Sequence, residues 1–312
     1  MKKISIVIPV FNEEEVLNRC YDELNEKLIS KIKYNFEIIF INDGSIDKSK
    51  EILTELSKKD NSVKVINFSR NFGSQNAIMA GLKFTEGDSI IIMDADLQDP
   101  VEALPDMIKL WEEGNDVIYG KRSTRKGESA FKLMTAKMFY STLNALSDVE
   151  IPKDTGEFRL VDRKIVDVIN NLPEHNKFLR GLFSWVGFKQ VPYEYNREER
   201  KEGQTKFTLK KMIRLSKDGI FSFSTKPLDI IGKFGFIVMI LAFAFLVYSI
   251  ISYIINPEAL VRGWTSLIVA ITFFSGVQLL SLWIIAQYIG RIYDEGKNRP
   301  NYIIESKFNI KE

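Results

Sequence analysis

Apolar and polar residues alternate in blocks over the first 120 residues of the chain. Short runs that are almost wholly apolar, such as ISIVIPV and SIIIMDA, are separated by longer amphipathic stretches. Apolar runs of this length predict strands buried on both faces, and the amphipathic stretches predict the helices that cover them. The predicted strands span residues 4–10, 36–42, 63–68, 89–95 and 116–120, and the predicted helices span 13–31, 47–59, 74–85 and 101–113. Strands that alternate with helices indicate an α/β fold with a mostly parallel sheet.

Two much longer apolar runs lie near the C-terminus, at residues 234–255 and 264–289, and neither contains a charged residue. About 20 apolar residues in a helix span the hydrocarbon core of a bilayer, so both runs predict transmembrane helices. A basic amphipathic segment at residues 207–229 precedes them and is typical of a helix at the membrane surface. The linker between the runs carries one basic residue, whereas several flank the outer ends, which places both termini in the cytoplasm.

We therefore expect four parts along the chain. These are a cytoplasmic α/β domain at residues 1–206, a juxtamembrane segment at 207–229, a pair of membrane helices within 230–290 and a cytoplasmic tail at 291–312. The predicted localisation is the cytoplasmic membrane. A net charge of +2 gives no sign of a nucleic-acid partner. Single cysteine and histidine residues, Cys20 and His175, exclude an internal disulfide and any site that needs two histidines.

Carboxylates follow the predicted fourth strand directly, in the sequence MDADLQDP. Ligands of parallel α/β sheets bind at the carboxyl ends of the strands, so these residues lie where such a fold has its site. In extended chain Asp94, Asp96 and Gln98 point the same way, and their oxygens suit Mg²⁺ or Mn²⁺ together with phosphate oxygens. The alternative is a polar loop that ends the strand, in which Asp99 caps the next helix.

Polar side chains also follow the first two predicted strands. Phe11 can stack on a flat ring, and Glu13 can accept a hydrogen bond from a hydroxyl. Asn42 and Asp43 can pair with the edge of a base or with ribose hydroxyls. Each group by itself also fits an ordinary strand exit or an Asp-Gly turn. Three oxygen-rich strand ends beside a membrane anchor are stronger evidence for a site than any one of them.

These segments, together with DTGEFRLVDR, FLRGLFSWVGF and GQTKFTLKKM, resemble the family-2 glycosyltransferases of the GT-A fold. More narrowly, the chain resembles the polyprenyl-phosphate glycosyltransferases, relatives of dolichol-phosphate mannose synthase and bactoprenol glucosyltransferase that carry two C-terminal membrane helices. The resemblance extends over nearly the whole chain. It implies a GT-A, Rossmann-like domain of mostly parallel sheet, followed by an interfacial amphipathic helix and two transmembrane helices.

The resemblance also implies a role for each matching residue. The uridine would be held by Pro9, Phe11, Glu13 and Asp43. The divalent ion and the donor diphosphate would be held by Asp94, Asp96 and Gln98. Arg122 would lie near the diphosphate or the acceptor phosphate. The lipid phosphate would be bound by Arg200 and Lys206, although attraction to anionic headgroups accounts for these two cations as well.

The catalytic residues that the resemblance implies are Asp96, Asp154 and Glu157. Relatives often have Asp in the place of Glu157, or nearby, as the proposed base, so the choice between Glu157 and Asp154 stays open. A phosphomonoester is already a nucleophile near pH 7, because its second pKa is about 6. The base would therefore position or deprotonate the acceptor. Arg159 either pairs with a carboxylate here or contacts phosphate.

The implied reaction is an inverting transfer of a sugar from a UDP-sugar to a polyprenyl phosphate such as undecaprenyl phosphate. The favoured donor is UDP-glucose. The products are a β-linked polyprenyl-phosphate sugar and UDP. The metal would stabilise charge on the leaving diphosphate. By resemblance alone, the chain would form a homo-oligomer, a tetramer. The sequence does not identify the sugar.

Two other functions fit parts of the sequence. IIIMDADLQD resembles the motif of haloacid-dehalogenase phosphatases, with Asp94 as nucleophile and Asp96 as acid. That motif expects Thr or Val at the position of Gln98, and it usually lies on the first strand. The other alternative is a membrane-anchored nucleotide-binding scaffold without catalysis. Its only support is that Glu157 stands where relatives often have the proposed catalytic Asp.

Overall fold

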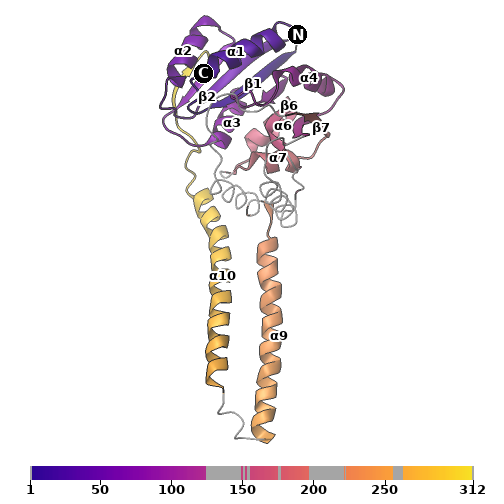
Figure 1. Cartoon of the computed structure of the whole chain (residues 1–312), viewed down its shortest axis with the longest axis vertical. Helices are drawn as coiled ribbons and strands as arrows, with labels where there is room; N and C mark the ends of the chain where they lie inside the picture. The colour runs from indigo at the N-terminus through magenta and orange to yellow at the C-terminus, as the bar shows by residue number, and fades with distance from the viewer. Residues whose placement is uncertain are drawn as a thin grey trace.

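The computed structural model describes residues 2–123, 149, 152, 155–174, 177–196, 221, 223–255 and 263–310. Figure 1 shows an α/β domain with two long helices that extend from the same side of it. The strands are β1 (Lys3–Val10), β2 (Asn35–Asn42), β3 (Val63–Phe68), β4 (Ser89–Ile92), β5 (Val117–Arg122), β6 (Thr155–Asp162), β7 (Gln190–Tyr195) and β8 (Ile304–Phe308). The α-helices are α1 (Leu17–Leu24), α2 (Ser49–Lys59), α3 (Ser74–Lys83), α4 (Leu104–Glu112), α6 (Arg163–Asn171), α7 (Leu179–Trp185), α9 (Lys226–Ile255) and α10 (Trp264–Gly296).

The eight strands form one mixed sheet in the order β7-β5-β6-β4-β1-β2-β3-β8. β1, β2, β3 and β4 run parallel, whereas β6 and β8 run antiparallel to their neighbours β4 and β3. The chain moves outward from β1 to β3 and then returns to the other side of β1 for β4. In α/β folds, ligands bind in the crevice that such a reversal of strand order leaves at the carboxyl ends of the strands. From here on, the crevice means the carboxyl ends of β1, β2 and β4 and the loops that follow them.

Hydrophobic side chains cover both faces of the sheet, as the uninterrupted apolar strands predicted. Ile6 and Ile8 of β1 pack on one face with residues of α1, α2 and α4, and Val7 packs on the other with residues of α3, α6 and α7. α3 lies so close to β1 that a Cβ on Gly81 would be 2.4 Å from Cγ1 of Val7. Cys20 is fully buried in the first cluster, so it is a structural thiol.

The predicted fourth strand and first helix are shorter in the structure, each for a physical reason. The fourth strand ends at Ile92 rather than at residue 95, because continuing it would bury the carboxylates that follow. The first helix begins at Leu17 rather than at residue 13 and continues as a π-helical turn, Asn25–Ile29. Its start is late because the N–H groups of residues 12–14 bond instead to side chains in the loop after β2 and at the first residue of α2.

The structure adds elements that the sequence pattern did not predict. Residues 121–196, for which the sequence analysis predicted no helix or strand, contribute β6, α6, α7 and β7. Residues 304–308, which were assigned to a C-terminal tail, form β8 and pair antiparallel with β3. Figure 1 accordingly places the C-terminus beside α2, within the α/β domain.

Both segments that were predicted to cross a membrane are helical, within α9 and α10. Many of their large apolar side chains are exposed. Among the residues that the structure describes, one stretch, Phe273–Gly296, is long and apolar enough to span a membrane. The hydroxyl of Tyr288 in α10 donates to the carbonyl of Ser224 (2.8 Å), so the segment that leads into α9 contacts α10.

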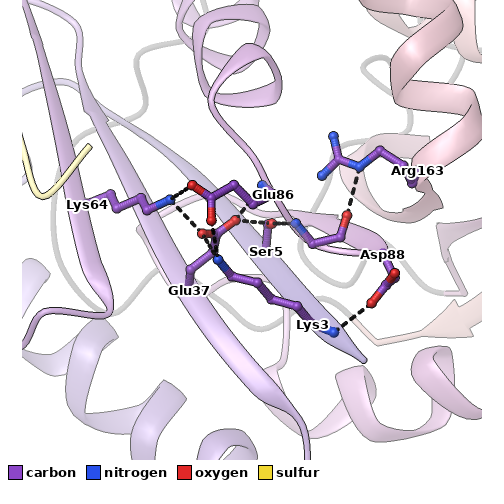
Figure 2. A network of polar contacts seen from close by, with 8 residues as sticks. Lys3, Ser5, Glu37, Lys64, Glu86, Asp88 and Arg163 are labelled. Atoms are coloured by element: carbon purple, nitrogen blue, oxygen red, sulfur yellow. Dashed lines mark hydrogen bonds and ion pairs between the residues drawn. The ribbon is translucent and has the colours of Figure 1, made fainter. Parts of the chain in front are cut away.

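A polar network lies at the amino ends of the strands, away from the crevice (Figure 2). Glu37 of β2 is 2% exposed, and its Oε2 forms ion pairs with Lys3 (2.7 Å) and Lys64 (2.8 Å). Its Oε1 accepts hydrogen bonds from the Ser5 hydroxyl and from the backbone N–H of Glu86. Burial by itself would raise the pKa of Glu37, but the two lysines and these hydrogen bonds lower it.

Candidate active site

The loops that leave β1 and β2 are tied together by hydrogen bonds. The backbone N–H of Asn12 donates to Oγ of Ser45 (2.9 Å), and Oδ1 of Asn12 accepts from the N–H of Ile46 (2.9 Å). The next N–H, of Glu13, donates to Oγ of Ser49 (3.0 Å). Pro9, Phe11 and Glu13, which were predicted to bind uridine, are partly buried along this edge.

Asp43 is buried and joins the loop after β2 to the loop after β3. Its carboxylate accepts hydrogen bonds from the backbone N–H groups of Phe72 (2.6 Å) and Gly73 (2.9 Å) and from Nδ2 of Asn71 (2.9 Å). Burial raises the pKa of the Asp43 carboxyl, and the N–H donors oppose that shift. Gly44 has φ +67°, and a Cβ there would lie 2.3 Å from the Arg70 carbonyl carbon, so only glycine lets these loops approach.

Asn42 is buried beside Asp43 and is also engaged within the protein. Its Nδ2 donates to Oδ1 of Asn67 on β3 (2.9 Å), and its Oδ1 accepts from the N–H of Ser45 (3.0 Å). Asn42 and Asp43 were both predicted to contact the nucleotide. In the structure both shape the loops around the crevice, and their contact with a ligand stays a prediction.

Asp94, Asp96 and Gln98 follow β4 and are partly buried at its carboxyl end. The expectation that they project from one extended segment is wrong, because the chain turns at Ala95–Asp96 and Leu97 has φ +55°. The turn brings the backbone N–H of Gln98 to Oδ1 of Asp96 (3.2 Å). No group of three His, Cys, Asp or Glu side chains that could hold a metal is found among the described residues. Two carboxylates fit an ion such as Mg²⁺, which keeps waters and phosphate oxygens as its other ligands.

Glu157 lies near the start of β6, next to the end of β4. It is 8% exposed, and its Oε1 accepts hydrogen bonds from Nε of Arg180 (2.7 Å) and Nε2 of Gln75 (3.1 Å). Its Oε2 is buried without a hydrogen bond among the described residues and lies 3.7 Å from Nη2 of Arg159. Burial alone would raise the pKa of Glu157, but Arg180 and Arg159 hold it below its ordinary value. Glu157 is therefore a fixed carboxylate at neutral pH.

Arg159 lies between β6 and α7. Its Nη2 donates to the Gly156 carbonyl (2.9 Å), and its guanidinium lies 4.3 Å from the centre of the Phe183 ring. Burial lowers the pKa of Arg159 to about 10, although Glu157 opposes that shift. Of the two possibilities that the sequence left open for Arg159, pairing with a carboxylate is the one described here.

Gln75 and Arg180 are site residues that the sequence analysis missed. Gln75 is the second residue of α3, and its Oε1 accepts a hydrogen bond from the backbone N–H of Leu179 (3.0 Å). One amide therefore links α3, β6 and α7. Arg180 lies in FLRGLFSWVGF, one of the segments that carried the family resemblance, whereas Gln75 lies outside those segments. Their roles could not be recognised from the sequence, because their partner Glu157 is 82 and 23 positions away.

Arg122 ends β5 and lies against the start of β6. A Cβ on Gly156 would be 2.8 Å from its Nη2, so the glycine makes room for the guanidinium. Its Nε is buried without a hydrogen bond among the described residues. Nearby, the Tyr195 hydroxyl donates to Asp99. The expectation that Asp99 caps the next helix is wrong, because Pro100 is in the cap position and no side chain caps that turn.

The structure therefore brings most of the predicted site residues to one edge of the sheet. Three of the predicted residues, Asp154, Arg200 and Lys206, lie outside the described residues, as does His175. Their roles stay predictions.

Comparison with known proteins finds similar sequences and structures. The model of glycosyl transferase family 2 matches residues 5–169. Over 98% of its length the chain is 50% identical to an uncharacterized glycosyltransferase of Bacillus subtilis, YkcC, of which it covers 94%. It is 43% identical to the bactoprenol glucosyl transferase of Shigella phage SfX, covering 98% of this chain and 99% of that one. Among solved structures, glucosyl-3-phosphoglycerate synthase from Mycobacterium tuberculosis is 20% identical, with a TM-score of 0.45 over 70% of this chain and 76% of that one.

Proposed function

The chain belongs to glycosyl transferase family 2, and we propose that it transfers glucose from UDP-glucose to undecaprenyl phosphate at a membrane surface. An oxygen of the acceptor phosphate attacks the anomeric carbon as the bond from that carbon to the diphosphate oxygen breaks. One displacement inverts the anomeric configuration and gives a β-linked polyprenyl-phosphate glucose and UDP. The names of full-length relatives support this donor and acceptor.

The observation that carries the proposal is the meeting of acidic side chains from separate strands at one edge of the sheet. Asp43 follows β2, Asp94 and Asp96 follow β4, and Glu157 enters on the antiparallel β6. The strand order reverses beside them, which is where α/β folds bind nucleotides.

In this proposal Asp94, Asp96 and Gln98 hold Mg²⁺ or Mn²⁺ and the donor diphosphate. When bound, the ion stabilises the negative charge that develops on the leaving diphosphate. Pro9, Phe11, Glu13, Asn42 and Asp43 frame the uridine. Arg122, whose Nε has no hydrogen bond among the described residues, faces a phosphate of the donor or acceptor.

Glu157 acts as a fixed negative charge beside the acceptor. With a pKa below its ordinary value it takes up a proton poorly. The acceptor phosphate is largely deprotonated at pH 7, since its second pKa is about 6, so no strong base is required. Glu157 orients Arg180 and Arg159 around the reacting groups, and Asp154 remains the second candidate for the base.

The two long helices place this chemistry at the lipid headgroups. α9 and α10 would cross the membrane as a hairpin, with the α/β domain and both termini in the cytoplasm. Arg200 and Lys206 would bind the lipid phosphate beside that surface. An active site at the membrane surface keeps the bound donor close to the acceptor phosphate, and this proximity contributes to the rate of transfer. The division of the chain at residues 206, 229 and 290, and a homo-tetramer, belong to the same proposal.

A transfer assay tests the proposed function. Full-length protein in detergent is given radiolabelled UDP-glucose and undecaprenyl phosphate with Mn²⁺, with EDTA, and as Asp96→Asn. We expect label in the lipid fraction, lost with EDTA and reduced at least about 100-fold in the variant. Asp22→Asn, on the exposed face of α1, is the control and keeps full activity.

Other donors and reactions are separated by the same assay. Transfer from UDP-N-acetylglucosamine or UDP-galactose in place of UDP-glucose would change the sugar and keep the reaction. No transfer from any donor would overturn the proposal and leave the non-catalytic scaffold. The haloacid-dehalogenase alternative is set aside, because the chain belongs to a glycosyl transferase family.

A further inference from the structure

The chain returns to the α/β domain after α10 and packs residues 302–309 onto the outer edge of the sheet. We call this segment the C-terminal clamp. Within it, β8 pairs with β3, and the Ser69 N–H donates to the Ile303 carbonyl (3.0 Å). The clamp lies far outside residues 5–169, which match the family.

Side chains of two clamp residues, Glu305 and Asn309, reach the rest of the α/β domain. Glu305 forms an ion pair with Lys50 of α2 (2.9 Å), but both side chains are open to solvent, so this pair contributes little. Nδ2 of Asn309 donates to the carbonyls of Ser57 (2.6 Å) and Val63 (2.9 Å). The two hydrogen bonds of Asn309 hold β8 in register with β3, so Tyr302 and Ser306 have defined partners toward the carboxyl end of β3.

An aromatic column runs from the clamp to a loop of the crevice. The Tyr302 ring stacks on Phe68 at the end of β3, with centroids 5.0 Å apart and planes 12° from parallel. Phe68 meets Phe72 edge to face at 5.7 Å. The N–H of Phe72 donates to Asp43 (2.6 Å), so the column ends on the carboxylate that joins the loops after β2 and β3.

A chain of hydrogen bonds runs in parallel across three strands, β8, β3 and β2, to the loop after β1. Nδ2 of Asn67 on β3 donates to Oγ of Ser306 on β8 (3.0 Å), and Nδ2 of Asn42 on β2 donates to Oδ1 of Asn67 (2.9 Å). The Ser45 N–H donates to Asn42, and Oγ of Ser45 accepts the N–H of Asn12 after β1. Asn42 and Asn67 are at most 1% exposed, where a missing partner is costly.

We propose that the C-terminal clamp is a positioning element of the donor site, in which Tyr302 and Ser306 set the loops that receive the nucleotide. This inference rests on the proposed function, because it takes the crevice to be the UDP site. The aromatic column and the hydrogen-bond chain reach the crevice by different routes, and both begin in the clamp. Residues 297–301 connect α10 to the clamp, so the second long helix is tied directly to the donor loops.

Binding of UDP tests this inference without requiring transfer. The dissociation constant of UDP with Mn²⁺ is measured by calorimetry on the full chain in detergent, and the melting temperature is measured on the same samples. Ser306→Ala removes the acceptor of Asn67, and Tyr302→Leu removes the stacked ring while keeping an apolar side chain. Glu305→Gln is the matched control on the same strand, since the Glu305 side chain pairs with the exposed Lys50 and takes no part in the aromatic column or the hydrogen-bond chain.

We expect Ser306→Ala and Tyr302→Leu each to weaken UDP binding about 3- to 10-fold, and the control to stay within about 2-fold. If Tyr302→Leu does not fold, the UDP affinity of Ser306→Ala alone tests the inference. A lower melting temperature with unchanged UDP affinity in both variants would reduce the clamp to an ordinary edge strand and overturn the inference alone. Failure of the unmodified chain to bind UDP would instead overturn the proposed donor, and the inference with it.

Discussion

Nε of Arg180 lies 2.7 Å from Oε1 of Glu157 and donates a hydrogen bond to it. The pair connects α7 with β6 and leaves Glu157 ionised inside the protein, since burial alone would raise the pKa of this carboxyl. Removing one partner of a buried ion pair leaves the other charge without compensation, so the pair offers a direct test of the site.

The first prediction concerns Arg180→Met. Without its nearest cation the pKa of Glu157 rises, so the carboxylate protonates at a higher pH than in the unmodified chain. We expect kcat/KM for transfer at pH 7 to fall by about 10- to 100-fold. The acid limb of the profile between pH 5 and 9 should move to higher pH. Arg180→Lys, which keeps a cation, should restore the limb; an equal loss of activity at every pH would show that the pair is structural only.

The second prediction concerns Gly44→Ala. The positive φ of +67° costs an alanine about 1–2 kcal/mol, and the overlap with the Arg70 backbone at 2.3 Å adds to it. Gly114→Ala is the matched control, because it has φ +88° but no atom within 4 Å of its Cβ. Thermal unfolding should show a larger loss for Gly44→Ala, with UDP binding weakened only there. Equal losses would contradict the close approach of the two loops.

The third prediction concerns Glu37→Gln in the network of Figure 2. The variant leaves Lys64, whose side chain is 9% exposed, with one carboxylate fewer, and we expect a loss of about 2–4 kcal/mol at pH 7. The folded pKa of Glu37 is lowered, so its contribution is present above the unfolded pKa of about 4.5 and is lost as pH falls through the folded value. Denaturant unfolding at pH 7 and pH 3.5 should show the two proteins converging in acid.

A pH-independent difference between Glu37→Gln and the unmodified chain would mean that packing, and not charge, explains the loss. Glu305→Gln serves as the exposed counterpart in this experiment. Its ion pair with Lys50 is open to solvent, so its removal should cost less than about 1 kcal/mol.

The fourth prediction concerns Cys20. Burial, with Glu23 and Asp96 nearby, raises the pKa of its thiol to about 12, so almost no thiolate exists at pH 8. N-ethylmaleimide should therefore leave the folded protein unlabelled over about an hour. It should label the protein denatured in about 6 M guanidinium chloride. Mass spectrometry counts the adducts, and rapid labelling of the native chain would contradict the buried position.

The hydrophobic pattern predicted secondary structure correctly where a residue's neighbours in the sequence are also its neighbours in the fold. β3 begins and ends at the predicted residues, because an apolar run bounded by polar turns has one way to be buried. The strand after Gly87 was predicted too long, since periodicity treats the apolar Met93 and Ala95 as strand while the carboxylates between and after them must leave the sheet.

The candidate site divides in the same way. Asp94, Asp96 and Asp43 could be predicted from sequence, because strand ends in a parallel α/β sheet lie at one edge whatever the detailed packing. Gln75 and Arg180 could not, because their importance comes from contacts with Glu157 across three elements.

By itself the sequence determined the alternation of strands and helices, the carboxylates at the strand ends, the two long apolar helices and the resemblance to a family. These follow from hydrophobic periodicity and local motifs, which are properties of short segments. Tertiary structure alone decided that β8 returns to β3 across more than 200 residues, that Asp43 holds the loop at Phe72, and that Glu157 sits between two arginines. Such contacts depend on how separate segments pack together, and no periodicity within one segment encodes them.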